Sequence, residues 1–257
     1  MRTIMEFPVL QRKALSYLDL NSLINGDILA LRIFPFIPSS LAQSLASRLL
    51  DHDHQIEHYS MAEDMGIRRF GMTLFEAENQ TEKLARYHRL AKDAGLKLRE
   101  LLFPLANPLD LLRVNLMEAW KSGVKIESIL GEPMNPGIVR CFDSEDSEGL
   151  PPHQDLISRD LPANKKAASL KVQMAANIYV KVPKKGGETD IWDFEPNLKE
   201  FEELREERYD FIDKGKLPNK HIRLKPREGE LILFRSTCVH AVRPSFSSTR
   251  IAFSCSI

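Results

Sequence analysis

The sequence KVQMAANIYVKVPKKGGETDIWDF, residues 171–194, has two runs of apolar, β-branched and aromatic residues on either side of a Pro-Lys-Lys-Gly-Gly segment. Runs of this kind separated by turn residues predict two short strands joined by a turn. Similar runs recur through the second half of the chain: GIVRCF (137–142), HIRLKP (221–226), GELILFR (229–235), VHAVRP (239–244) and TRIAFSCSI (249–257). The chain beyond about residue 130 is therefore expected to consist mainly of β-strands.

The first half of the chain shows helical periodicity instead. Apolar residues recur at three- and four-residue spacing in 39–51, 79–102 and 109–121, which predicts three amphipathic helices. The run DILALRIFPFI (27–37) predicts a strand that joins the same sheet system as the second half. We therefore expect a single domain over 1–257, with a mainly helical part (1–130) and a β core (131–257).

Residues 195–220 interrupt the series of predicted strands. This segment is highly charged and partly helical in period, which predicts an insertion that lies over the β structure. Two interpretations remain open at this point: a solvated covering helix, or a lid over an active site.

The composition excludes several classes of protein. The 36 Lys and Arg residues balance 36 Asp and Glu residues, whereas a protein that binds nucleic acid or an anionic membrane usually carries a basic excess. No apolar run is long enough to span a bilayer, and the N-terminus lacks the order of a signal peptide, so a cytoplasmic protein is expected. Without a Cys-x-x-C spacing, Cys141, Cys238 and Cys255 are expected to be reduced core residues.

Candidate metal ligands lie in the β half. His153 and Asp155 in PPHQD (151–155) are two residues apart, so on a strand both would face one side. His240 follows much later, and Arg250 comes ten residues after it. Two imidazoles and one carboxylate bind iron on one face and leave positions open for co-substrates. An arginine on a neighbouring strand has the geometry to hold the far carboxylate of a 2-oxo acid.

With these residues in place, the sequence resembles the Fe(II)/2-oxoglutarate-dependent oxygenases. AANIYVKVPKKGGETDIW (175–192) is similar to the strand, turn and strand of the prolyl-hydroxylase-like branch, and LKPREGELILF (224–234) to the strand that precedes the second iron histidine. The ten-residue spacing from His240 to Arg250 also matches. The resemblance covers 137–257 and implies an α+β fold: a double-stranded β-helix (jelly-roll, cupin-like) core with flanking N-terminal helices.

The resemblance also implies the site and its cofactors. The enzyme would use Fe(II) with 2-oxoglutarate and O2 as co-substrates, and it would release succinate and CO2. Its iron ligands, which are also its catalytic residues, would be His153, Asp155 and His240. Arg250 would bind the 2-oxoglutarate C5 carboxylate, and Arg140, Asn177 and Tyr179 would lie near the co-substrate or serve only in sheet packing. In the halogenases of this superfamily Gly or Ala replaces the carboxylate, so Asp155 favours hydroxylation.

The substrate expectation rests on a narrower resemblance. RRFGMTLFEAENQ (68–80) and LPPHQD (150–155) look like a bacterial branch that hydroxylates or chlorinates free amino acids, lysine among them. A buried charged substrate needs charged partners. The expected substrate-binding residues, for each of which a purely structural role is an equal alternative, are Arg69 for the carboxylate, Glu132 for an ammonium, Trp192 as a wall, and Ser254 and Ser256 on the face of Arg250.

Three functional hypotheses follow. The first is hydroxylation of a small-molecule substrate, a free amino acid of polar or basic character such as lysine, with neither nucleic acid nor membrane as a partner. The second is a protein or peptide side-chain (prolyl-type) hydroxylase, which needs an open groove. The third is a binding or sensing module without turnover, which the retention of all three iron ligands and Arg250 disfavours. A zinc site at His52, His54 and His58 is the weaker interpretation of DHDHQIEH, because H-E-x-x-H is absent.

Overall fold

The computed structural model describes residues 9–58, 65–77, 80–128, 131–143, 148–206 and 211–257. Its larger sheet has eight strands in the order β1-β2-β11-β7-β14-β5-β4-β3. All neighbouring strands in it are antiparallel except β1 and β2. The strands are β1 (Val9–Arg12), β2 (Ala30–Ile33), β3 (Glu57–His58), β4 (Ile67–Phe70), β5 (Ile138–Phe142), β7 (Met174–Lys181), β11 (Leu231–Arg235) and β14 (Arg250–Ser256).

A smaller sheet packs against the larger one. Its strand order is β10-β9-β12-β6, and a separate two-stranded ribbon joins β8 to β13. The strands are β6 (Leu150–His153), β8 (Lys185–Gly186), β9 (Thr189–Ile191), β10 (Ile222–Leu224), β12 (His240–Val242) and β13 (Ser245–Phe246). A buried cluster that includes Tyr179, Ile191, Ile232 and Phe234 draws side chains from both sheets. The two packed sheets form the expected double-stranded β-helix.

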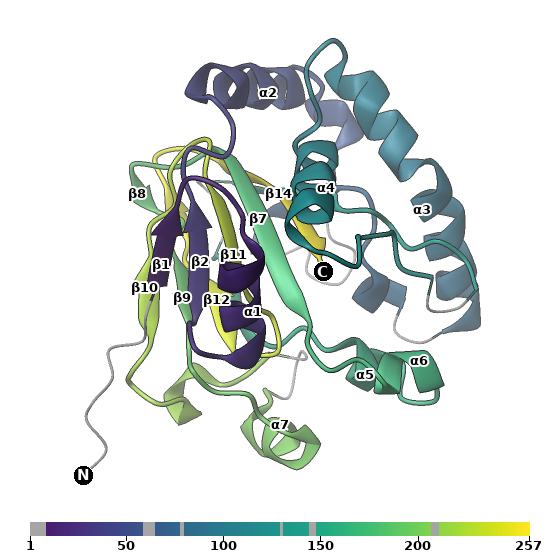
Figure 1. Cartoon of the computed structure of the whole chain (residues 1–257), viewed down its shortest axis with the longest axis vertical. Coiled ribbons are helices and arrows are strands. Elements are labelled where there is room, and N and C mark those ends of the chain that lie inside the picture. Colours follow the sequence, from purple (N-terminus) through teal and green to yellow (C-terminus); the bar gives the residue numbers. More distant parts are fainter. Residues whose placement is uncertain (1–8, 59–64, 78–79, 129–130, 144–147, 207–210) are drawn as a thin grey trace.

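Helices of the N-terminal half cover the other face of the larger sheet (Figure 1). They are α1 (Tyr17–Asn25), α2 (Ser39–Asp51), α3 (Thr81–Leu102) and α4 (Pro108–Ala119). Short helices lie elsewhere: α5 (Ile157–Asp160), α6 (Lys165–Ala168), α7 (Leu198–Leu204) and the 3₁₀ turns η1 (Asp53–Gln55), η3 (Leu74–Ala77) and η4 (Lys214–Lys216). The largest core cluster joins α1 to α4 with alternate residues of the sheet, such as Ile178 and Val180 of β7.

The structure confirms the three helices predicted from periodicity, as α2, α3 and α4, with ends that differ by at most two residues. Strand β2 from the 27–37 run pairs with β11, so it joins the sheet system as predicted. Helix α1 and strand β4 were not predicted. Strand β4 has two adjacent arginines in its four residues, IRRF, which hide the usual apolar alternation.

The described parts of the predicted insertion, residues 195–206 and 211–220, contact the smaller sheet. Asn197 and Glu200 form a capping box at the start of α7. Phe201 from α7 packs with Ile212 and Leu217 against the outer side of the smaller sheet, where it meets Trp192 and Val239. These apolar contacts make at least this part of the insertion an integral cover of the smaller sheet.

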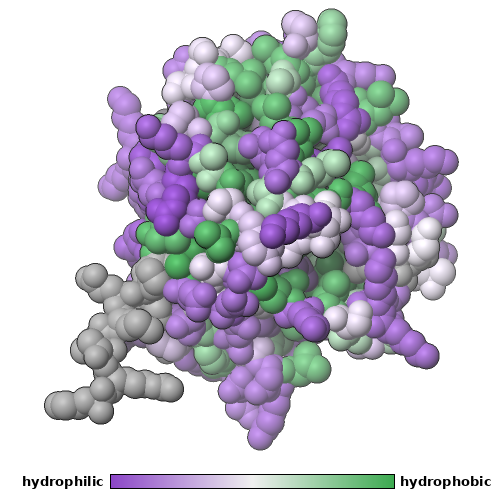
Figure 2. Space-filling view, viewed as in Figure 1, coloured by the Kyte–Doolittle hydropathy of each residue, from purple (hydrophilic) through white to green (hydrophobic). Residues whose placement is uncertain are grey.

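The surface is mixed in character. Figure 2 shows hydrophilic side chains distributed over the visible face, with smaller hydrophobic areas between them. Among the described residues, no helix is both long and apolar enough to cross a membrane. Cys141, Cys238 and Cys255 are free thiols, and burial raises the pKa of each to about 12, so all three stay protonated at neutral pH.

Candidate active site: an iron and 2-oxoglutarate centre

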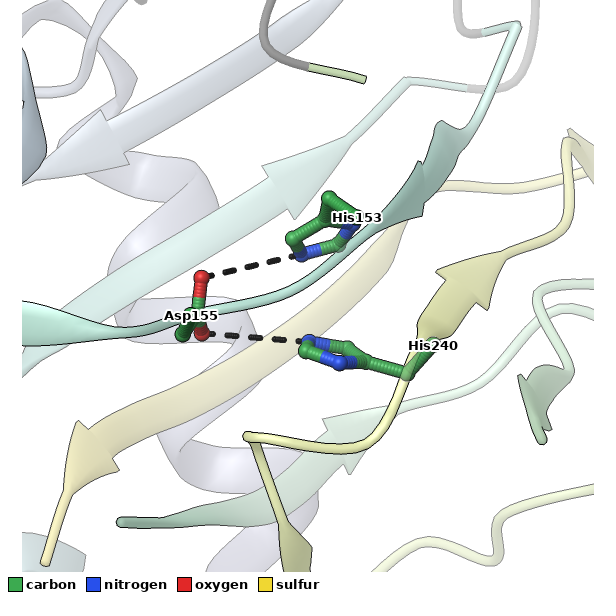
Figure 3. A group of neighbouring side chains, drawn as sticks. All are labelled: His153, Asp155 and His240. Carbon is green, nitrogen blue, oxygen red and sulfur yellow. Dashed lines mark ion pairs between the residues drawn. The ribbon is translucent and has the colours of Figure 1, made fainter. Parts of the chain in front are cut away.

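Two neighbouring strands of the smaller sheet bring the two histidines together. His153 ends β6, His240 begins β12, and the two are register partners. The Asp155 carboxylate lies 3.9 Å from Nε2 of His153 and 3.8 Å from Nε2 of His240 (Figure 3). Within the described part of the chain, these three residues are the one group of at least three His, Cys, Asp or Glu side chains placed to hold a metal ion.

One detail of the expected geometry is wrong. Strand β6 stops at His153, so Asp155 lies in the segment after the strand and not two residues further along it. The backbone N–H of Asp155 instead donates to the carbonyl oxygen of Ser236 at 3.0 Å. This hydrogen bond ties the segment to the end of β11, which places the carboxylate beside both imidazoles.

Backbone hydrogen bonds orient both imidazole rings. Nδ1 of His153 lies 2.8 Å from the carbonyl oxygen of Pro151, and Nδ1 of His240 lies 2.9 Å from that of Cys238. A carbonyl accepts a proton, so Nδ1 carries the hydrogen and the lone pair of Nε2 faces Asp155. This tautomer is the one that binds a metal through Nε2.

Electrostatics favour the metal-binding protonation states. Burial, with the charge of His240 as a second cause, lowers the pKa of His153 to about 3, and burial also lowers the pKa of His240. Burial alone would raise the pKa of Asp155, but the two histidines and Arg140 lower it below its ordinary value. At neutral pH the site therefore offers two neutral imidazoles and one carboxylate, a donor set that fits Fe(II) and leaves further positions open.

Arg250 on β14 is a buried cation that lacks an acidic partner among the described residues. Its guanidinium carbon lies 4.8 Å from the ring centroid of Phe142 and 4.9 Å from that of Tyr179. One terminal nitrogen donates to the Tyr179 hydroxyl at 3.3 Å, while the buried Nε has no hydrogen-bond partner. A buried cation needs an anion, and the C5 carboxylate of 2-oxoglutarate fits this requirement.

The glycine pair of the G-G-E-T turn allows close packing, and Gly187 makes room for this arginine. Gly187 has φ +69°, and a Cβ there would lie 2.8 Å from Cγ of Pro183 and 3.2 Å from Cδ of Arg250. At Gly186, with φ +81°, a Cβ would lie only 1.9 Å from the carbonyl oxygen of Pro244. A side chain at either position would be strained, and it would press on Arg250 at Gly187 and on the backbone of Pro244 at Gly186.

A cavity of about 340 Å³ joins the metal-binding residues to Arg250. Its inner end is lined by the three metal-binding residues, by Arg140, Asn177, Arg250 and Ser254 of the larger sheet, and by Thr189 of β9 in the smaller sheet. Its outer part is lined mainly by the N-terminal half: residues 72–75, 124–127 and 134–137 and the α4 side chains Leu109, Leu112, Arg113 and Leu116. One space therefore connects a metal site, an anion site and an apolar wall.

Residues 137–256 match the family model of the 2OG-Fe(II) oxygenase superfamily. This part of the chain is therefore a 2OG-Fe(II) oxygenase domain. It is thus an Fe(II)- and 2-oxoglutarate-dependent dioxygenase, and the cofactor and co-substrates expected from the sequence are confirmed.

Relatives extend the likeness beyond the β core of the oxygenase. The chain is 25% identical to the L-gamma-glutamyl-L-propargylglycine hydroxylase of Streptantibioticus cattleyicolor over 97% of its own length and 91% of that protein. The fold is shared with an N-substituted L-amino acid dioxygenase from Burkholderia ambifaria, with 18% identity, a TM-score of 0.61 and coverage of 93% and 86% of the two chains. The complex of that enzyme with alpha-KG gives a TM-score of 0.57 at 19% identity and the same coverage.

The oxygenase cavity contains four of the side chains predicted to bind co-substrate or substrate besides Arg250. Arg140, Asn177, Ser254 and Ser256 all line it, and the Ser254 hydroxyl donates to Oδ1 of Asn177 at 2.6 Å. Tyr179 contacts two residues that line the cavity: its hydroxyl accepts a hydrogen bond from Arg250 and lies 3.4 Å from Oγ1 of Thr189.

Three predicted substrate residues lie elsewhere. Arg69 is buried in a bidentate ion pair with Glu76, so its charge is already neutralised. Trp192 points away from the cavity, and its Nε1 donates to the carbonyl oxygen of Pro218 at 2.9 Å. Glu132 is exposed. These three residues are not among the described residues that line the cavity, and we assign them no part in substrate binding.

Several residues of the cavity wall are not predicted by the sequence. Arg113 on α4 and Lys125 beyond it add positive charge, and Asn135 reaches the wall through a hydrogen bond from its backbone N–H to the Tyr87 hydroxyl at 2.9 Å. None of them lies in a motif, and the helical period of α4 predicts only that one of its faces is buried. Thr189 could have been recognised from the sequence, because it belongs to the G-G-E-T turn.

Proposed function

We propose that this oxygenase hydroxylates an unactivated C–H bond of an amino acid substrate. The observation that carries the proposal is one cavity, which links the His153–Asp155–His240 group to Arg250 and continues to a wall built by α4. Arg250 is buried and has no acidic partner among the described residues. The names of the two relatives, a gamma-glutamyl amino acid hydroxylase and an N-substituted amino acid dioxygenase, support an amino acid as the substrate class.

Each residue of the inner cavity has a role in this proposal. His153, Asp155 and His240 would hold Fe(II), and Arg250, positioned by Tyr179, would bind the C5 carboxylate of 2-oxoglutarate. When bound, iron and co-substrate supply the oxidising chemistry: substrate, O2 and 2-oxoglutarate give hydroxylated substrate, succinate and CO2. The hydrogen bond between Ser254 and Asn177 fixes two polar side chains that line the same cavity. The protein itself orients the reactants and limits the entry of water.

Hydroxylation is the outcome that the metal ligands favour. Asp155 occupies the third ligand position, so the site has the carboxylate that a halide would have to replace. A carboxylate flanked by two neutral imidazoles leaves the remaining positions for 2-oxoglutarate and O2.

The shape of the cavity favours a small substrate over a polypeptide. A volume of about 340 Å³ lies at the lower end of ordinary small-molecule sites, and α4 with residues 124–127 closes one side of it. A free polar or basic amino acid such as lysine would need acidic partners for its ammonium groups. Besides Asp155, the described cavity wall has two acidic side chains, Glu127 and Asp160.

The proposal is tested in two steps with the purified protein. Under anaerobic conditions Fe(II) and 2-oxoglutarate should give a weak visible charge-transfer band, which reports the assembled centre. In air, succinate formation is then followed with the proteinogenic amino acids and their N-acetyl derivatives, and products are examined for a one-oxygen mass gain. A band without stimulation by any amino acid or derivative would overturn the substrate class and direct the search to peptides.

A further inference from the structure

Asp155 differs from the two histidines in how its position is fixed. His153 and His240 are register partners on β6 and β12, whereas Asp155 follows β6 in a segment outside the described strands. Its carboxylate nevertheless points toward both imidazole rings (Figure 3). A metal-binding side chain outside the regular sheet needs other contacts to orient it. The contacts of Gln154 and Arg159 supply them.

The peptide unit that joins Gln154 to Asp155 is held at both of its polar groups. Its N–H donates to the carbonyl oxygen of Ser236 at 3.0 Å, and its carbonyl oxygen accepts from Nη2 of Arg159 at 2.7 Å. A peptide unit is planar, so a hydrogen bond at each of these groups fixes the orientation of the plane. The Cα atom of Asp155 belongs to that plane. The two hydrogen bonds therefore set the direction in which the carboxylate leaves the chain.

The side chain of Gln154 ties the same segment to the turn before His240. It is buried, and its amide nitrogen donates to the carbonyl oxygens of Thr237 at 2.7 Å and Pro196 at 3.2 Å. The neighbour of Thr237, Cys238, provides the carbonyl oxygen that orients the His240 ring. Gln154 thus connects the metal-binding segment with the turn that positions His240 and with the start of the insertion.

Arg159 is itself in contact with the insertion. Nη1 of its guanidinium donates to Oε1 of Gln154 at 3.3 Å, and its guanidinium carbon lies 4.0 Å from the centroid of the Phe201 ring. Phe201 belongs to α7 and is buried in the cluster that includes Trp192. The planar group of an arginine that stacks on an aromatic ring is restricted in its orientation. Helix α7 therefore limits where Arg159 can place its hydrogen-bond donors.

Building on the function and the iron ligands proposed above, we propose that Arg159 is a positioning residue of the iron centre and that α7 of the insertion holds it in place. Arg159 fixes the Gln154–Asp155 peptide, and Phe201 fixes Arg159. The described residues 195–206 and 211–220 do not line the cavity, so the insertion acts on the centre from outside it. Partners that orient metal ligands contribute strongly to metal affinity. Loss of the Arg159 contacts is therefore expected to weaken the binding of Fe(II).

The first test measures the affinity for Fe(II) in Arg159→Met. This variant keeps an apolar chain over Phe201 and loses both hydrogen bonds to Gln154. Anaerobic titration of Fe(II) at saturating 2-oxoglutarate, followed by the charge-transfer band, should give a dissociation constant about tenfold higher than that of the parent protein, with the same band at saturation. By charge alone, removal of a cation beside the metal-binding segment would strengthen the binding of Fe(II). Weaker binding thus identifies a loss of position.

Arg48→Met is the matched control. The guanidinium of Arg48 on α2 also donates to two backbone carbonyl oxygens, those of Leu101 and Phe103, but it lies outside the cavity wall and the metal-binding group. Circular dichroism verifies folding, and the control should keep the parent affinity for Fe(II). An unchanged or lower dissociation constant in Arg159→Met, or an equal rise in both variants, would overturn the inference. Absence of the band in the parent protein would instead overturn the proposed function, and the inference with it.

The second test addresses the contact with α7 and leaves Arg159 unaltered. Phe201→Leu keeps a buried apolar side chain but removes the aromatic face beside the guanidinium, so it should raise the dissociation constant of Fe(II) about threefold. In combination with Arg159→Met it should add nothing further, because Phe201 acts through Arg159. Leu198→Ala, on the exposed side of α7, should leave the constant unchanged. An unchanged constant in Phe201→Leu, or a further threefold rise in the double variant, would overturn the role of α7.

Discussion

His240 on β12 lies directly opposite His153 on β6, and the centroids of the two imidazole rings are 4.1 Å apart. The separation of the rings is set by the pairing of two antiparallel strands, so it follows from backbone hydrogen bonds and not from a mobile loop. Metal sites built on paired strands hold their ligands in a narrow range of positions.

Replacing either histidine should abolish assembly of the iron centre. His153→Ala and His240→Ala each remove one of three protein ligands, so the anaerobic charge-transfer band with Fe(II) and 2-oxoglutarate is expected to vanish. His54→Ala, at an exposed histidine outside the site, is the control and should keep the band. Circular dichroism verifies that all three variants fold. A folded His240→Ala variant with a normal band would refute the ligand assignment.

Arg250→Met should separate stability from co-substrate binding. Without 2-oxoglutarate the arginine is buried and lacks an acidic partner among the described residues, so the variant is expected to melt at the same temperature as the parent protein or higher. With 2-oxoglutarate the parent should gain stability and the variant should gain none, because the affinity falls by about 100-fold, or about 3 kcal/mol. Thermal melting with and without 2-oxoglutarate measures both effects. Equal stabilisation of the two proteins would show that another residue binds the C5 carboxylate.

Tyr179→Phe should weaken the binding of 2-oxoglutarate only modestly. The Tyr179 hydroxyl accepts a hydrogen bond from Arg250, and the aromatic ring that packs on the guanidinium is retained in phenylalanine. Loss of one hydrogen bond to a charged group corresponds to about 1.5 kcal/mol, or about tenfold in the KM for 2-oxoglutarate. The KM for the amino acid substrate should not change. An equal rise in both constants would indicate a general disturbance of the cavity.

The sequence named most residues that the structure brings together at the inner end of the cavity, because they lie in motifs that specify backbone geometry. Side chains along β9 alternate between the two faces of the smaller sheet. Thr189 faces the cavity and Ile191 lies between the sheets, whereas Asp190 binds Arg223 on the outer face. Trp192 follows the same alternation and must point outward, so period two alone would have corrected its assignment as a wall of the pocket.

The outer part of the site could not be predicted in the same way. Its wall comes from α4 and the segments around it, and the helical period shows which residues are buried but not which cavity they meet. The assignment of Arg69 failed for a related reason. A buried arginine does need an anion, but the anion here is Glu76, seven residues away. The Glu76 carboxylate accepts hydrogen bonds from the Arg69 guanidinium and from Thr73.

The insertion should contribute to stability through one side of α7. Phe201 is buried against Trp192 and lies under the guanidinium of Arg159, whose carbon is 4.0 Å from the ring centroid. Phe201→Ala is expected to lower the free energy of unfolding by about 3 kcal/mol. Leu198→Ala, on the exposed side of the same helix, should change it by less than about 0.5 kcal/mol. Urea unfolding of both variants measures the difference, and equal effects would show that α7 does not depend on the Phe201 contact.

A buried carboxylate next to β11 should make stability depend on acid pH. Glu230 accepts hydrogen bonds from the guanidinium groups of Arg32 and Arg227. Burial alone would raise the pKa of Glu230, but these two arginines lower it below its ordinary value. The folded protein therefore holds the carboxylate charged more firmly than the unfolded chain does. This contribution is complete above the ordinary pKa of about 4.3 and is lost as the pH falls through the lower, folded value.

Glu230→Gln should expose this contribution. At pH 7 the variant is expected to lose about 3 kcal/mol of unfolding free energy, because two partly buried arginines lose the buried anion that they share. Between pH 5 and the acid limit of folding, its stability should then fall less steeply than that of the parent protein, since the titrating group is absent. Glu100→Gln, at an exposed position on α3, removes the same charge and should follow the parent curve. Urea unfolding across this pH range gives the three curves, and parallel curves for the parent and Glu230→Gln would exclude Glu230 as a source of the acid sensitivity.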